Sequence, residues 1–226
     1  MTNTDSTTHT APASTPAADD PRTVFAHAVV TAGRAIAAVR PEQLDQPTPC
    51  DQFDVSALLG HLLVVLRRVA LLGEGGDPMA LPRVVAGVAD DEWLATWTRD
   101  AHRVQAAWTD DATLGRMMVL PWVTAPGAAM LAMYTSELTV HTWDLATATG
   151  QQPEWDDQVV AVSLEAALRG LPSGDREAAF AELMANLPPT APAGFGADGR
   201  PFGNPVAVGE HEPAITRLVA WYGRRP

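Results

Sequence analysis

One segment of the 226-residue chain limits the possible folds more than any other. Residues 55–72, VSALLGHLLVVLRRVALL, are apolar on nearly every face of a helix. Such a helix is stable in water only where other helices cover it. His61, Arg67 and Arg68 interrupt the run, which leaves it short of the roughly 20 apolar residues that cross a bilayer. The segment therefore predicts a buried helix in a bundle, ending at Gly73.

Further helices are predicted on both sides of this segment. Each combines apolar residues at helical spacing with Asp, Pro or Gly at one or both of its ends. They cover residues 21–40, 90–108, 126–150, 156–171, 176–186 and 214–222, and a short strand is predicted at 206–208. We therefore predict an all-α fold: a disordered tail over 1–20, then a single domain with a four-helix core over 21–150 and an irregular, mainly helical extension over 151–226.

Charge and cysteine content exclude several classes of protein. Asp and Glu number 27 against 15 basic residues, and the net charge of −12 disfavours binding to nucleic acid or to an anionic membrane surface. A single cysteine, Cys50, excludes an internal disulfide framework. The first twenty residues have neither the cationic nor the apolar run of a signal peptide. Together these features predict a cytoplasmic protein.

Two residues of the predicted helix 126–150 could hold a metal ion. Glu137 and His141 are four residues apart, so both side chains lie on one face, at a spacing that suits a chelate. Facing helices of a bundle commonly carry such sites. The same spacing is also frequent by chance, in which case the two residues form an ordinary surface pair worth a few tenths of a kcal/mol.

His61 stands among apolar residues in the middle of the predicted buried helix. It is either a neutral histidine that is hydrogen-bonded to a backbone carbonyl, or a third ligand that meets Glu137 and His141 across the bundle. Sequence alone favours neither interpretation. Three protein ligands would leave one coordination position open, as in catalytic zinc sites.

Other side chains are candidates for accessory roles. Arg67 and Arg68 could bind a carboxylate of a substrate or thiol cofactor, or could simply extend from the helix end into solvent. Tyr134 and Asp144 could orient a substrate or relay a proton, and Asp144 could instead support a ligating histidine or cap the helix. Cys50 is interpreted as a half-buried, inert thiol rather than as a ligand or nucleophile.

Two motifs resemble a known family. The segments TPCDQFDVSALLGHLL and ELTVHTWDLATATG are similar to two signatures of the DinB-like proteins related to mycothiol-dependent maleylpyruvate isomerase. Phe53 stands where the family usually has Trp, and Gln52 where it usually has Gly. The closing ITRLVAWYGRRP is similar to the end of the short members of this family. The resemblance covers residues 22–226 and implies a DinB-type four-helix bundle with a divalent metal, usually zinc, held by His61, Glu137 and His141.

The resemblance also implies a choice of reactions. The first hypothesis is a thiol S-transferase in which the metal activates a mycothiol-type cosubstrate toward a small electrophile. The alternatives are an isomerase of the maleylpyruvate type, a hydrolase that uses metal-bound water, and a non-catalytic module that binds or sequesters a small molecule. The three residues could also form a polar cluster without metal. Zinc, nickel, cobalt and iron all suit the donor set, and both monomer and homodimer remain open.

Overall fold

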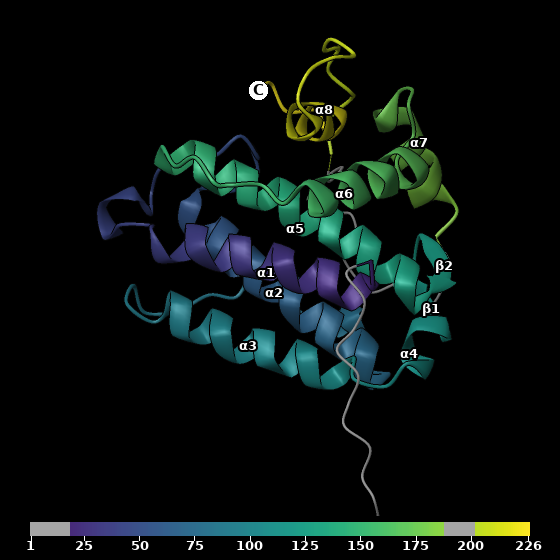
Figure 1. Cartoon of the computed structure of the whole chain (residues 1–226). Coiled ribbons are helices and arrows are strands. Elements are labelled where there is room, and N and C mark those ends of the chain that lie inside the picture. Colours follow the sequence, from purple (N-terminus) through teal and green to yellow (C-terminus); the bar gives the residue numbers. More distant parts are fainter. Residues whose placement is uncertain (1–18, 188–201) are drawn as a thin grey trace, which may run out of the picture.

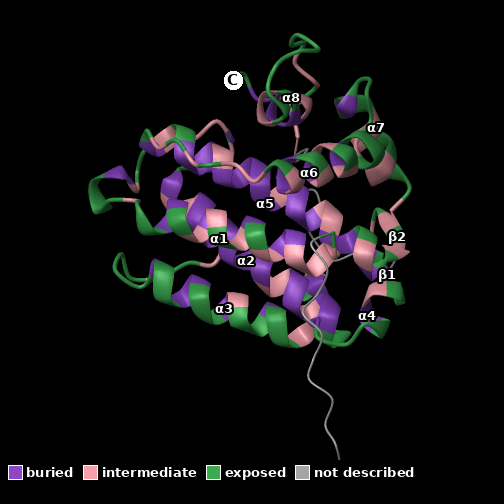
Figure 2. Cartoon of the chain, in the orientation of Figure 1, coloured by how far each residue is buried: buried purple, intermediate pink, exposed green. Residues whose placement is uncertain are grey.

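Four long helices form the body of the part of the chain that the structure describes (Figure 1). The structure is a computed structural model that describes residues 19–187 and 202–226, so most of the predicted N-terminal tail lies outside the described residues. The four helices are α1 (Pro21–Ala37), α2 (Val55–Glu74), α3 (Trp93–Ala107) and α5 (Gly127–Thr149). The predicted all-α bundle is confirmed, and Figure 2 shows its buried residues gathered where the helices face one another.

Helix α2 occupies the core as predicted. Its apolar residues include several that are fully inaccessible, among them Leu58, Leu62, Val65 and Leu66. By length and composition α2 could cross a membrane, contrary to the expectation that it is too short, but 72% of its most apolar window is buried inside the bundle. A position of this kind is typical of the core helix of a globular fold.

Helix α2 ends at Glu74, one residue beyond the predicted end at Gly73. Its C-terminal cap is Gly75, which adopts the left-handed conformation with φ 79°, so Gly75 rather than Gly73 is the glycine that stops the helix. Gly73 lies inside the helix, where a Cβ atom would come within 2.7 Å of the Trp108 indole nitrogen. Close packing of α2 on the end of α3 therefore explains this glycine.

Helix α5 crosses the bundle and packs against α1, α2 and α6. It follows Pro126 and is capped by the left-handed Gly150. Many of its polar side chains are buried. Threonine hydroxyls among them donate hydrogen bonds to backbone carbonyl oxygens one turn back, as Thr135 does to Leu131 and Thr142 to Leu138, both at 2.7 Å. Because its hydroxyls are satisfied in this way, α5 can carry polar and ionisable groups into the interior.

Short elements connect the helices, and several were not predicted. They are the 3₁₀ turns Pro41–Gln43 and Pro78–Ala80, the single-turn helix α4 (Ala112–Gly115), and a hairpin of β1 (Met117–Leu120) and β2 (Val123–Pro126). The hairpin is antiparallel, with Leu120 opposite Val123. Its two-residue turn, Pro121-Trp122, lacks the Asn-Gly or Asp-Gly pair that marks most such turns in a sequence.

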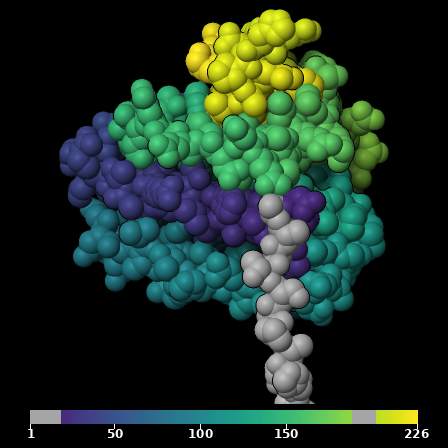
Figure 3. Space-filling view, viewed as in Figure 1, coloured from purple at the N-terminus to yellow at the C-terminus, as the bar shows by residue number. Residues whose placement is uncertain are grey.

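The C-terminal extension is helical, as predicted. It contains α6 (Asp157–Gly170), α7 (Arg176–Ala185) and α8 (Ala214–Trp221). Helix α8 packs on α6, and its Leu218 and Val219, with Tyr222 just after it, form a second apolar cluster with Val140 of α5. Figure 3 shows the C-terminal segment covering this side of the bundle.

The strand predicted at 206–208 is absent. These residues have no strand beside them among the described residues, and Val206 instead donates its N–H to the carbonyl oxygen of Ala220 at 2.9 Å. A run of Val residues can favour a strand only where a partner strand supplies hydrogen bonds. The segment therefore runs as irregular chain along the end of α8.

Candidate functional site

Helices α2 and α5 bring His61, Glu137 and His141 together. One ligand atom from each of the three side chains lies within 4.8 Å of the other two. His61 Nε2 is 3.3 Å from Glu137 Oε1, and the two imidazole rings meet edge to face with their centroids 4.9 Å apart. The side chains of His61 and His141 are 6% and 5% exposed, whereas that of Glu137 is 19% exposed. The three residues thus form a compact site whose most accessible member is Glu137.

The orientation of His61 is fixed by the chain segment that follows α2. Its Nδ1 lies 3.0 Å from the carbonyl oxygen of Arg83. This segment lies against α2 at Gly60, where Val85 donates its N–H to the Gly60 carbonyl at 3.2 Å. A Cβ atom at position 60 would lie only 2.3 Å from the Val85 carbonyl oxygen, so the approach requires glycine. Phe53 stacks on the imidazole at a centroid distance of 4.9 Å.

This orientation determines the tautomer of His61. A carbonyl oxygen only accepts hydrogen bonds, so Nδ1 carries the ring proton and Nε2 presents its lone pair toward Glu137. The lone pair of Nε2 and the carboxylate oxygen then face one another at 3.3 Å. Two acceptors at this distance require a second proton on the imidazole or a cation between them.

His141 is oriented by a buried ion pair. Its Nδ1 lies 3.1 Å from Asp144 Oδ2, and Asp144 accepts two hydrogen bonds from Arg224, from Nε to Oδ1 and from Nη2 to Oδ2, both at 2.9 Å. Burial opposes ionisation of Asp144, but the hydrogen bonds from His141 and Arg224 outweigh it and lower its pKa. Since an ionised carboxylate is an acceptor only, Nδ1 carries the proton and Nε2 of His141 is the free nitrogen.

The ionisation states of the site suit metal binding. Burial lowers the pKa of His141, which keeps the imidazole neutral. Burial would raise the pKa of Glu137, but its contact with His61 and the nearby charge of Arg68 lower it instead, so the carboxylate is ionised. Two imidazoles and one carboxylate are the donor set of many zinc and non-haem iron sites. The residues present therefore fit a divalent metal.

The two predicted arginines have different surroundings. Arg67 donates from Nε to Asp100 Oδ2 of α3 at 2.6 Å, so its charge is paired within the α2–α3 interface. Arg68 lies closer to the candidate site, and its charge acts on both Glu137 and Tyr134. The Nε atom of Arg68 and the hydroxyl of Tyr134 are buried and have no hydrogen-bond partner among the described residues.

Asp144 and Cys50 lie behind His141. Asp144 is fully buried and holds His141, which is one of the alternatives stated for it from the sequence. Cys50 is 2% exposed, and its Sγ belongs to a second compact group with His141 and Asp144. Burial raises the pKa of the Cys50 thiol, so it is protonated at neutral pH. Because Arg224 already holds both oxygens of Asp144, this second group is a closed polar network.

Three contributors to the site were not predicted: Gly60, the Arg83 carbonyl and Arg224. The ion pair of Arg224 joins residues 80 positions apart in the sequence, and a backbone carbonyl leaves no trace in a residue pattern. The one available signal was the closing GRRP motif, which matched the family signature without any role attached to its arginines.

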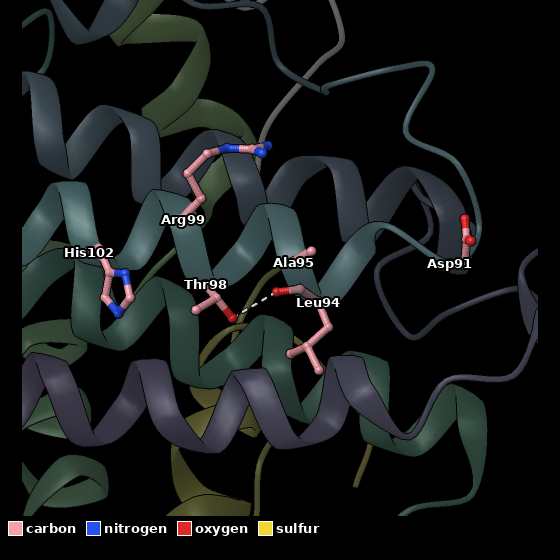
Figure 4. A pocket seen from close by; sticks show the side chains of 6 residues that line it. All are labelled: Asp91, Leu94, Ala95, Thr98, Arg99 and His102. Atoms are coloured by element: carbon pink, nitrogen blue, oxygen red, sulfur yellow. Dashed lines mark hydrogen bonds between the residues drawn. The ribbon is translucent and has the colours of Figure 1, made fainter.

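A shallow surface depression lies elsewhere, on the outer face of α3 (Figure 4). It is lined by Asp91, which precedes the helix, and by Leu94, Ala95, Thr98, Arg99 and His102 of the helix itself. None of these residues belongs to the group formed by α2 and α5. His102 of α3 is therefore separate from the candidate site.

Comparison with known proteins agrees with these features. The model of the family described as "Mycothiol maleylpyruvate isomerase N-terminal domain" matches residues 25–146, from α1 to near the end of α5. Uncharacterised proteins from two Mycobacterium tuberculosis strains, CDC 1551 / Oshkosh and H37Rv, are each 26% identical over 189 residues, covering 84% of this chain and 89% of theirs.

Two solved structures are also similar. A crystal structure of the mycothiol-dependent maleylpyruvate isomerase has a TM-score of 0.49 at 16% identity, over 67% of this chain and 68% of that one. A mutant of that enzyme has a TM-score of 0.45 at 14% identity, over the same shares of each chain. The family match extends over more than half of the chain and includes all three residues of the candidate site. The chain therefore belongs to the mycothiol maleylpyruvate isomerase N-terminal domain family.

Proposed function

We propose that His61, Glu137 and His141 bind one divalent cation, zinc in the first instance, and that the protein is a metal-dependent thiol S-transferase. The observation that carries the metal proposal is the facing pair of His61 Nε2 and Glu137 Oε1 at 3.3 Å. The imidazole proton is committed to the Arg83 carbonyl, so a cation between the two atoms relieves the repulsion of their lone pairs. His141 supplies a second nitrogen, Nε2, and its ring is oriented by the hydrogen bond between Nδ1 and Asp144.

The ligand set determines what else would bind. A divalent metal held here would lower the pKa of a coordinated thiol so that it loses its proton at neutral pH. An imidazole binds a metal in its neutral form and Glu137 would add one negative charge, so a site loaded with a divalent cation would keep a net positive charge that favours an anionic ligand such as a thiolate. Glu137 is the most exposed of the three side chains, and its side of the site is where such a ligand would enter.

The identity of the thiol comes from the family. The family is named for mycothiol, and we propose a thiol of this type as cosubstrate and a small electrophile as acceptor. An isomerase of the maleylpyruvate type is the second candidate, favoured by the same family name. Both candidates share the metal, the thiol and a small-molecule substrate, and they differ in whether the thiol remains bound to the product.

The first experiment is elemental analysis of protein purified without a histidine tag. We expect about one equivalent of zinc or another divalent metal, lost in His141→Ala and Glu137→Ala while the helical circular dichroism spectrum is kept. His102→Ala, which removes an exposed histidine of α3, is the matched control and should keep the metal. Wild-type protein that holds no metal and takes none up on dialysis would overturn the proposal.

Turnover assays then separate the reactions. Multiple turnovers of an electrophile that require mycothiol and consume it support the S-transferase, and turnovers that require it without consuming it support the isomerase. Turnover without thiol indicates hydrolysis by metal-bound water, and stoichiometric binding without turnover indicates a sequestering module. Either of the last two outcomes would contradict the thiol proposal while leaving the metal site intact.

A further inference from the structure

Two buried hydrogen-bond donors near the site have no acceptor among the described residues. They are the hydroxyl of Tyr134 on α5 and the Nε atom of Arg68 on α2. A buried donor without a partner costs about 1–3 kcal/mol, so native proteins retain few of them and each needs an explanation. Tyr134 is 1% exposed, which excludes bulk water as the partner of its hydroxyl in this structure.

Both donors lie beside Glu137. Tyr134 precedes Glu137 by three residues on α5, and Arg68 follows His61 by seven residues, two turns along the same face of α2. Side chains of a helix lean toward its N-terminus, so the Glu137 carboxylate extends over the turn that carries Tyr134. Burial, and after it the charge of Glu137, raises the pKa of Tyr134, so this group remains a donor at neutral pH.

The three candidate ligands are supported unequally. His61 has the Arg83 carbonyl behind it and His141 has Asp144, so each imidazole has an outer partner. The contacts of the described residues give Glu137 one partner only, His61, and only through Oε1. Carboxylates that bind metals are normally held by outer hydrogen bonds of their own. The site therefore combines an unsupported carboxylate with two nearby donors that lack an acceptor.

We propose that Arg68 and Tyr134 are positioning residues for Glu137, donating to its second carboxylate oxygen when the metal is bound. This assignment rests on the proposed metal site. It differs from the role in substrate binding that the sequence indicated for Arg67 and Arg68. Arg67, the neighbour of Arg68, is excluded from this role because its Nε is held by Asp100 at 2.6 Å.

The test is zinc affinity, measured by competition with a chelating indicator for the full chain. Tyr134→Phe removes one oxygen atom and Arg68→Met removes the charge but keeps an apolar stem; each should weaken zinc binding by about tenfold or more. Tyr222→Phe and Arg67→Met are the matched controls, since the Tyr222 hydroxyl already bonds Ser136 at 2.8 Å and Arg67 already pairs with Asp100. Both controls should change the affinity less than twofold.

A second measurement does not depend on affinity. The chain has two tyrosines, so ring-labelled tyrosine gives two sets of resonances, which Tyr222→Phe assigns. Zinc should shift the Tyr134 resonances in the wild type, and the shift should change in Arg68→Met. Unchanged zinc affinity in both Tyr134→Phe and Arg68→Met would overturn the assignment. The two donors would then be available to hydrogen-bond a bound substrate instead of Glu137. Wild-type protein that binds no zinc would instead refute the proposed metal site itself.

Discussion

The ion pair between Asp144 and Arg224 gives the sharpest prediction about stability. Asp144 is fully buried and Arg224 is 6% exposed, and the guanidinium donates to both carboxylate oxygens at 2.9 Å. Arg224→Met would leave a buried carboxylate with one remaining hydrogen bond, to His141. Removing one partner of a buried ion pair typically costs about 3–5 kcal/mol, a large part of the 5–15 kcal/mol that stabilises a typical domain.

The assay is urea unfolding followed by circular dichroism at neutral pH. We expect the urea concentration at the unfolding midpoint to fall. The slope of the free energy of unfolding against urea concentration should stay constant, because the same surface is exposed on unfolding. Arg225→Met is the control, since Arg225 is the exposed neighbour in the same segment and its loss should change the free energy of unfolding by less than about 0.5 kcal/mol. The double variant Asp144→Asn, Arg224→Met should be more stable than Arg224→Met alone, because no charge is left buried.

Two results would refute this reasoning. A loss below about 1 kcal/mol for Arg224→Met would place the pair in the range of solvent-exposed ion pairs. A double variant no more stable than Arg224→Met would show that the cost came from lost packing of the C-terminal segment and not from an unpaired carboxylate. In either case the orientation of His141 could no longer be attributed to this ion pair.

Three further predictions concern the framework around the site. Gly60→Ala should lower the free energy of unfolding by about 1–3 kcal/mol and lower the metal content, because the new Cβ meets the Val85 carbonyl. Its control, Gly170→Ala, has open space around the new Cβ and should not destabilise the protein. Chemical unfolding and elemental analysis of both variants test this. Leu62→Ala should cost about 2–5 kcal/mol in a urea titration, since the side chain is 0% exposed in α2. Asp156→Ala removes the N-cap of α6 and should cost about 1 kcal/mol at pH 7. The hydrogen bond from the Val159 N–H is the main cause that lowers the Asp156 pKa below 3.8. The stabilisation by the Asp156 carboxylate is therefore complete above that pH and disappears as pH falls through the lower folded-state pKa. Unfolding at a series of pH values should show the difference in free energy of unfolding between wild type and Asp156→Ala narrowing only below about pH 4.

Local patterns accounted for the helices and placed two of the three residues of the candidate site on one face. The apolar residues of α2 predicted its place in the core because no other position covers all of its faces. Glu137 and His141 were placed on one face by helical periodicity alone. The pattern could not decide between a buried neutral His61 and a ligand, and the structure has both features at once: Nδ1 bonds a carbonyl and Nε2 faces Glu137.

The features that were missed depend on contacts between distant segments. Arg224 is 80 residues from Asp144, and the Arg83 carbonyl is 22 residues from His61, so neither contact follows from local spacing. The β1–β2 hairpin was missed because its Pro121-Trp122 turn lacks a glycine signal, and the strand at 206–208 was wrong because its residues have no partner strand. Sequence periodicity indicates which face of an element is buried, but it does not indicate which residues of other segments contact that face.

The arrangement of the site explains why the C-terminal extension belongs to it. His61 is oriented by a segment next to α2, so its geometry depends on the bundle alone. His141 is oriented by Asp144, whose two oxygens are both held by Arg224 from the end of the chain. Arg176 of α7 in turn donates to the carbonyl oxygens of Gly203 and Trp221, which ties α7 to the end of the chain. Changes in the extension should therefore reach the candidate metal site through His141 and leave His61 in place.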